Sequence, residues 1–112
     1  MKIAIPIVDG QLSLHFGHCA HFALVDVDEK NKKIIATKLV DPPAHEPGVL
    51  PKWLHKQGAT VILAGGMGTR AQDLFKQNGI QVVVGCPSVA PATLVEAYLS
   101  GELVAGDNVC DH

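Results

Sequence analysis

Three histidines and one cysteine stand within seven residues near the start of the chain, in the stretch His15-Phe16-Gly17-His18-Cys19-Ala20-His21. The last three residues of the sequence, Cys110-Asp111-His112, carry the same side-chain types. Imidazole nitrogen and thiolate sulfur are donors that proteins use to bind soft and borderline metals. We therefore expect a metal site whose candidate ligands are His15, His18, Cys19, His21, Cys110 and His112.

These residues also have simpler interpretations. Histidines in a loop are often plain polar residues that hydrogen-bond to the backbone, and a chain end is commonly disordered. A Cys-x-His pair is too short to complete a site, so Cys110 and His112 need ligands from elsewhere. A disulfide between Cys19 and Cys110 is a third alternative, disfavoured in a reducing compartment. His45 is a further candidate ligand, although a solvated loop explains it equally.

A glycine-rich turn, Gly65-Gly66-Met67-Gly68, follows an apolar run and precedes a helical pattern. Backbone N–H groups at the start of a helix favour anions. The turn lacks the Gly-Lys-Ser/Thr ending of a phosphate loop, and a tight strand-to-helix turn is its plain alternative. Cys86 follows the next apolar run, where it is either a ligand or a small buried hydrophobe. The Met67 thioether is likewise either a ligand or part of the core.

Composition limits the function classes. The chain has 112 residues, of which 47% are hydrophobic and 18% charged, and this predicts one globular domain. The formal net charge of −2 argues against a nucleic-acid partner. No apolar stretch approaches about 20 residues and no signal peptide opens the chain, so we expect a cytoplasmic protein outside the membrane. No Ser-His-Asp arrangement or Gly-x-Ser-x-Gly turn is evident, and we expect no enzymatic turnover.

The elements that must position these residues follow from periodicity and breakers. Apolar runs predict strands over Lys2–Val8, Phe22–Asp28, Lys33–Val40, Thr60–Ala64 and Ile80–Val84. Helical spacing predicts helices over Val49–Gln57, Thr69–Asn78 and Ala92–Ser100, and Gln11–Ala20 is expected to be a loop.

The first three strands should be antiparallel, and the later strand–helix–strand units parallel and right-handed. We therefore expect an α/β fold with a mixed five-stranded sheet and helices on both faces. Its single domain would cover residues 1–105, and residues 106–112 would form a flexible tail.

The order of several motifs resembles the dinitrogenase iron–molybdenum cofactor biosynthesis family, which includes NifX-like carriers and the C-terminal part of NifB-like proteins. The resemblance rests on Ser13–Gly17, Ala64–Gly68, Asn78–Val82 and Glu96–Gly101, and covers essentially the whole chain. Pro43–Trp53 and Asn108–His112 are similar to a stand-alone subgroup of small proteins. Relatives often have a basic or small residue where His18 and Cys19 stand, so metal binding by this chain is expected to be either tighter or of a different kind.

The resemblance implies a ribonuclease-H-like three-layer α/β/α fold. It also implies noncovalent carriage of an iron–sulfur or molybdenum-containing cluster or its precursor, with cluster donor and acceptor proteins as partners. Carried onto this sequence, the cofactor contacts would come from the histidine stretch, including Phe16 and Gly17, and from Gly65, Gly66, Met67 and Gly68.

Three hypotheses follow. The first is a cluster carrier or scaffold in which His15, His18 and Cys19 ligate or hydrogen-bond the metal centre, while Cys110 and His112 close over it as a flexible lid. The second is a mononuclear zinc or copper site with a structural or regulatory role. The third is a nucleotide-binding enzyme that uses the Gly65–Gly68 turn, ranked last because no catalytic base is paired with an evident nucleophile.

Overall fold

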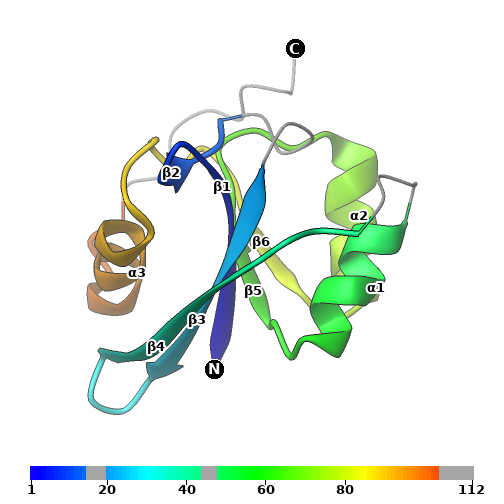
Figure 1. The fold of residues 1–112 in the computed structure, drawn as a ribbon. Coiled ribbons are helices and arrows are strands. Elements are labelled where there is room, and N and C mark those ends of the chain that lie inside the picture. The colour runs from blue at the N-terminus through cyan, green and yellow to red at the C-terminus, as the bar shows by residue number, and fades with distance from the viewer. Residues whose placement is uncertain (15–19, 44–47, 104–112) are drawn as a thin grey trace.

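A computed structural model describes residues 1–14, 20–43 and 48–103 of the chain (Figure 1). The strands are β1 (Lys2–Val8), β2 (Gln11–Leu12), β3 (His21–Asp28), β4 (Lys33–Val40), β5 (Val61–Leu63) and β6 (Gln81–Val83). The helices are α1 (Val49–Lys56), α2 (Thr69–Gln77) and α3 (Pro91–Ser100).

The strands form one mixed sheet in the order β4-β3-β1-β5-β6, with β2 paired to β1 beside this path. The β4–β3 and β3–β1 pairs are antiparallel, whereas β1–β5 and β5–β6 are parallel. The predicted α/β fold with a mixed sheet is confirmed. The prediction of a continuous loop over Gln11–Ala20 was wrong for its first two residues. Gln11 and Leu12 form the short strand β2, in which Leu12 pairs with Ile7 of β1.

Helices cover both faces of the sheet, which gives three layers (Figure 1). On one face, alternate residues of β1 such as Ile3 and Ile5 pack with Leu94 and Val95 of α3. On the other face, Ala4 packs with Leu50 and Leu54 of α1 and with Phe75 of α2. Because both faces of β1 are buried, its sequence is a nearly continuous apolar run. Each face therefore has its own core, and the sheet separates the two.

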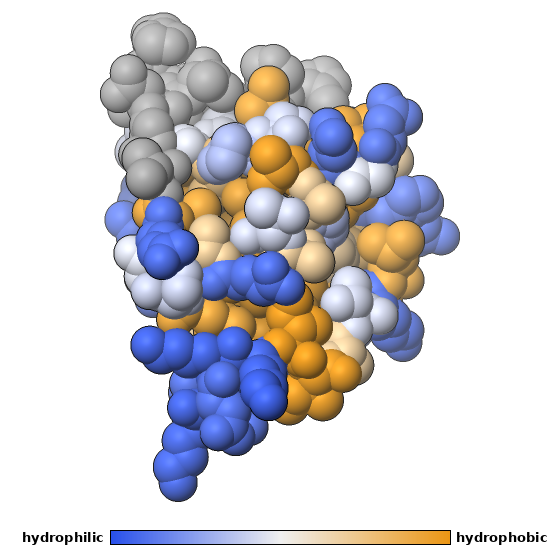
Figure 2. All heavy atoms as spheres, turned by 90° about the vertical axis from the view of Figure 1, so that its left-hand side faces the viewer, coloured by the Kyte–Doolittle hydropathy of each residue, from blue (hydrophilic) through white to orange (hydrophobic). Residues whose placement is uncertain are grey.

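Strand β4 is one edge of the sheet, and most of its side chains are exposed. Ile35 and Leu39 are 69% and 61% exposed, and Figure 2 shows apolar side chains beside the polar tip of the β3–β4 hairpin. The edge also carries Lys33 and Lys38 and a register shift between Asp26 and Val27. Lysines and bulges are common devices that discourage an edge strand from pairing with another chain.

In the described part of the chain, no helix combines the length and the apolar character needed to cross a membrane.

Candidate functional site

The candidate site lies where the parallel strands β1 and β5 end. The chain leaves β1 toward β2 and β3 on one side, and leaves β5 through α2 toward β6 on the other. Two neighbouring parallel strands whose connections depart in opposite directions leave a crevice beyond their carboxyl ends. Ligands of open α/β sheets bind at such a point. Residues 13–14, which follow β2, and the glycine turn, which follows β5, meet at this end of the sheet.

Ser13 and Leu14 lie between the end of β1 and the glycine turn. The Ser13 amide donates to the Pro6 carbonyl over 2.8 Å, and the Gly66 amide donates to the Leu14 carbonyl over 2.8 Å. Pro6 has no N–H to donate, and the paired residues of β1 and β5 are limited to Ile3 with Val61 and Ala4 with Ile62. The two strands therefore stop pairing before Pro6, and residues 13–14 occupy the space that opens.

Gly65 makes this close contact sterically possible. A Cβ at Gly65 would lie 2.9 Å from the Leu14 Cα and 3.1 Å from the Leu14 carbonyl oxygen. Both atoms belong to the backbone and cannot rotate away, so glycine is required by packing rather than by an unusual φ. The backbone of Leu14, the residue that precedes the histidine stretch in the sequence, is thereby held directly against the turn.

Further hydrogen bonds hold the two sides of the histidine stretch at this edge. The Leu12 amide donates to the Val89 carbonyl over 3.0 Å, and the Ser88 hydroxyl donates to the Leu12 carbonyl over 2.8 Å. After the stretch, the Ala20 amide donates to the Ile7 carbonyl over 2.8 Å. Residues 15–19 are thus bracketed by anchored backbone on both sides.

Most predicted ligands lie outside the described residues: His15, Phe16, Gly17, His18, Cys19, His45, Cys110 and His112. Their part in a site stays a prediction. Within the described ranges, no three His, Cys, Asp or Glu side chains gather into a group that could hold a metal ion.

Of the six candidate ligands in the histidine stretch and at the end of the sequence, His21 is the one that the structure describes. Its Nδ1 lies 2.7 Å from an Asp41 Oδ1, and both side chains are well exposed, at 49% and 84%. In many metal sites a carboxylate accepts the proton of one ring nitrogen, which fixes the tautomer and leaves the other nitrogen free for the metal. The pair lies at the candidate edge of the sheet, because His21 is opposite Ile7 near the end of β1.

A β-bulge sets this pairing. Asp28 faces Lys33 and Val27 faces Ile34, but beyond the bulge Asp26 faces Ala36 and Phe22 faces Val40. One extra residue on β4 has therefore shifted the register by one position. If the register after the bulge is extended by one residue beyond the Phe22–Val40 pair, Asp41 lies opposite His21. Without the bulge, Val40 would lie opposite His21.

The glycine turn divides into buried and exposed parts. Gly65, Gly66 and Met67 are buried, and the Gly66 amide is already bonded to Leu14. Met67 is 1% exposed and packs in the core under α1 and α2, so its thioether is not presented at the surface. Burial and internal hydrogen bonding leave little of Gly65, Gly66 and Met67 open to a ligand, and their cofactor contacts stay a prediction.

Gly68 is exposed and precedes the first turn of α2. That first turn contains no acidic residue, and no side chain caps it. Among the described residues, no acceptor takes the amide protons of Gly68, Thr69 or Arg70. These amides carry partial positive charge at the helix start, so this end of the turn retains the predicted affinity for anions.

Cys86 follows β6 and is a small buried side chain of the core, one of the two roles that its residue type suggested. It is 2% exposed in the core below α3, and burial raises the pKa of its thiol. Its Sγ lies 3.8 Å from the Val83 carbonyl, the distance of a weak thiol donor. A protonated, enclosed thiol is a poor metal ligand, so the structure favours packing over ligation.

The sequence did not single out three residues that build this edge: Leu14, Asp41 and Ser88. Leu14 gave no chemical signal, because its contribution is a backbone carbonyl. Asp41 had one: in a hairpin of Phe22–Asp28 with Lys33–Val40, the residues just beyond the strand ends must lie near each other. The hairpin pattern therefore indicated which residues lie near His21. It could not identify Asp41 as the partner, because the choice between Val40 and Asp41 depends on the bulge.

Comparison with known proteins sets this geometry in context. The family model for the dinitrogenase iron-molybdenum cofactor matches residues 1–101. The chain belongs to this family. The uncharacterized protein MJ0580 of Methanocaldococcus jannaschii is 34% identical over 85 residues, which are 73% of this chain and 72% of that protein.

Solved structures of similar proteins share the architecture. The crystal structure of PH0822 aligns with a TM-score of 0.85 and 31% identity, covering 94% of each chain. The apo form of the orange protein from Desulfovibrio gigas aligns with a TM-score of 0.74 and 26% identity, covering 96% of this chain and 93% of that one. The dinitrogenase cofactor family thus accounts for the fold and indicates a cluster-related role.

Proposed function

We propose that this protein binds and carries an iron–sulfur or molybdenum-containing cluster, or its precursor, without turnover of its own. Membership of the dinitrogenase iron-molybdenum cofactor family supports the class of cargo. Donor and acceptor proteins of cluster assembly would be its partners. The cargo is the substrate of the carrier and would be released to a partner rather than kept.

One observation carries the proposal: Leu14 is fixed against Gly65 and Gly66. The Gly66 amide holds the Leu14 carbonyl at 2.8 Å, and Gly65 leaves no room for a side chain between them. Because His15 is the next residue in the sequence, we propose that the ligand-rich stretch begins beside the turn that opens α2. Nitrogen and sulfur donors would then share one site with anion-binding amides.

The described residues suggest a division of roles. Metal–sulfur clusters bear negative charge on their sulfide or oxo groups, which the amides of Gly68, Thr69 and Arg70, unpaired among the described residues, would stabilise. His21, oriented by Asp41, would offer its free ring nitrogen from the β3 side. His15, His18 and Cys19 would supply the remaining donors, as the sequence predicts.

A mononuclear zinc or copper site is the second candidate, and the His21–Asp41 pair favours it specifically. A histidine whose second nitrogen meets a carboxylate is the usual arrangement around a single zinc ion. Such a site would use His21 with ligands from the histidine stretch and would leave the helix-start amides without a role.

Anaerobic purification, followed by metal analysis, sulfide analysis and a visible absorption spectrum, separates the two candidates. Iron or molybdenum together with sulfide and charge-transfer absorption is the result expected of a cluster carrier. One zinc per chain with no visible absorption would refute cluster carriage for this protein.

A further inference from the structure

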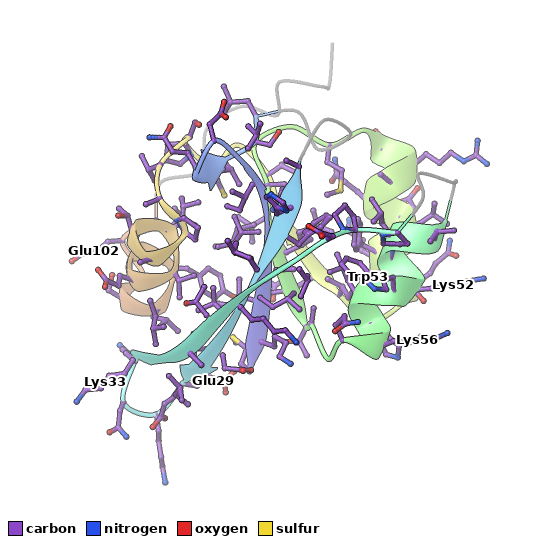
Figure 3. The ribbon with its side chains drawn as sticks, viewed as in Figure 1. Glu29, Lys33, Lys52, Trp53, Lys56 and Glu102 are labelled. Carbon is purple, nitrogen blue, oxygen red and sulfur yellow. The ribbon has the colours of Figure 1, made fainter. Side chains whose placement is uncertain are left out.

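The outer side of α1 carries a groove away from the candidate metal site. Leu50 and Leu54 turn the buried side of α1 into the core. A second stripe follows the helix at intervals of three and four residues and lines a hollow of about 280 Å³ together with Pro43: Val49, Lys52, Trp53 and Lys56. Figure 3 shows Lys52, Trp53 and Lys56 on one side of the molecule, with both lysines reaching outward.

Among the described residues that line this groove, the polar side-chain groups are hydrogen-bond donors. Lys52 and Lys56 are exposed, and no carboxylate among the described residues pairs with either. The indole N–H of Trp53 bonds to no described residue, and no described side-chain nitrogen is both buried and unpartnered, so this N–H reaches the surface. A ligand that satisfies the groove must therefore supply acceptors and negative charge.

The apolar part of the groove is held in place. The Trp53 ring meets the ring of Phe22, which is 0% exposed, edge to face with centroids 5.8 Å apart and an interplanar angle of 66°. Val49 and Pro43 provide the remaining apolar surface. A rigid aromatic side chain that is half-buried loses little conformational entropy on binding, which is a property of residues that dominate interfaces.

The spacing of the stripe fits an extended peptide. Lys52 and Lys56 are four residues apart, a rise of about 6 Å along a helix, and Val49 and Trp53 form a parallel apolar row with the same spacing. Alternate residues of an extended chain are about 6.7 Å apart. A segment lying along α1 can thus place successive carboxylates on the two ammonium groups and keep apolar groups against the Val49–Trp53 row.

We propose that this groove docks an acidic, apolar segment of a partner protein. Pro43 is two residues from Asp41, so a partner seated here would lie beside the His21–Asp41 edge of the candidate site. The identity of the partner as a donor or acceptor of the cargo rests on the proposed function. The docking itself is independent of that function and is tested on metal-free protein.

The single tryptophan of the chain is a built-in reporter of the groove. Metal-free full-length protein is titrated with a capped peptide of alternating glutamate and leucine, while Trp53 fluorescence and the indole N–H resonance are followed. We expect a saturable change that weakens as salt is added, because the contacts are charged. A peptide of alternating lysine and leucine serves as the charge-reversed probe and should leave both signals unchanged.

Two double variants with the same change in net charge decide whether the groove is responsible. Lys52→Glu/Lys56→Glu should weaken binding of the acidic peptide by at least about tenfold, whereas Lys30→Glu/Lys33→Glu at the β3–β4 turn should change it by less than about twofold. Figure 3 shows Lys33 on the opposite side of the molecule from the groove. Circular dichroism of both variants confirms that each is folded.

Three results would overturn the docking proposal. They are an unchanged Trp53 signal with the acidic peptide, equal weakening by both double variants, and an equal response to inorganic phosphate alone. The last would identify a site for small anions instead. None of these results bears on metal content, so failure of the docking proposal is distinct from failure of cluster carriage.

Discussion

At the scale of single residues, Gly65 and Leu14 form the contact on which the candidate site depends. Gly65→Ala would bring a Cβ to 2.9 Å from the Leu14 Cα, so backbone must shift. We expect a loss of roughly 1–3 kcal/mol in the free energy of unfolding, the usual cost of overpacking. Gly68→Ala is the matched control, because a Cβ there meets nothing within 4 Å. Urea denaturation measures both, and equal stabilities would contradict the assigned role of Gly65.

Asp41 is predicted to orient His21 for metal binding. Asp41→Asn keeps the size of the side chain but removes the charge that lies 2.7 Å from the His21 Nδ1. Metal affinity, measured by competition with a chelator, should fall by about 10–100-fold, as it does when carboxylate partners of ligating histidines are lost. Asp73→Asn, an exposed position on α2, is the control. Unchanged affinity in Asp41→Asn would remove His21 from the metal site.

Cys86 is expected to be unreactive in the folded protein. Burial encloses its sulfur and raises the pKa of the thiol, so the thiolate that attacks alkylating reagents is scarce at neutral pH. Mass spectrometry after brief iodoacetamide treatment should find Cys86 unmodified, and denaturation should expose it. Rapid modification in the native state would show that this part of the core opens readily.

At the scale of elements, the β3–β4 hairpin has a turn whose stability depends on pH. Asn31 donates to Asp28 through its side chain, with support from the backbone amides of Asn31 and Lys30, and these bonds lower the pKa of the Asp28 carboxyl. A lowered pKa means that the stabilisation is present above the unfolded-state value and is lost as pH falls through the folded-state value.

Asn31→Ala should therefore raise the pKa of Asp28, and the variant should be less stable than the original protein at neutral pH but not in strong acid. Carbon-13 NMR titration of the Asp28 carboxyl and denaturation at several pH values measure the two effects. A stability difference that persists at low pH would mean that Asn31 acts through something other than this carboxylate.

The elements themselves show where sequence reasoning succeeds and where it stops. The strands Lys2–Val8 and Lys33–Val40 match their predicted bounds, because apolar runs and breakers mark them clearly. Strand β2 was missed because two residues carry no periodic signal. The bulge beside Val27 was also invisible, since it depends on how the two strands pair rather than on either strand alone.

At the scale of the whole molecule, topology brings the chemistry together. The predicted order of antiparallel strands followed by parallel units placed the first loop and the glycine turn at the same end of the sheet, and the structure has them in contact through Leu14. The sequence could not show that this contact is made by a backbone carbonyl, or that Met67 faces the core. Both depend on tertiary packing that residue types alone do not specify.

A second property of the whole molecule is that the candidate metal site and the groove along α1 are separate surfaces. The candidate metal site lies at the end of the sheet, whereas the Lys52–Trp53–Lys56 groove runs along α1 and approaches the site through Pro43. On the proposed function, the cargo would occupy one surface and the protein that receives it would occupy another. This arrangement would let a partner dock beside the cargo without displacing the residues that hold it.

The decisive test of cluster binding at the histidine stretch is the metal and sulfide content of two double variants purified anaerobically beside the original protein. His15→Ala/Cys19→Ser removes two predicted ligands, and His55→Ala/Cys86→Ala removes the same residue types from α1 and from the core. We predict iron or molybdenum with sulfide in the original protein and the control, and loss of both from His15→Ala/Cys19→Ser while the fold persists. Undiminished metal and sulfide in that variant, or zinc without sulfide in all three proteins, would contradict the account.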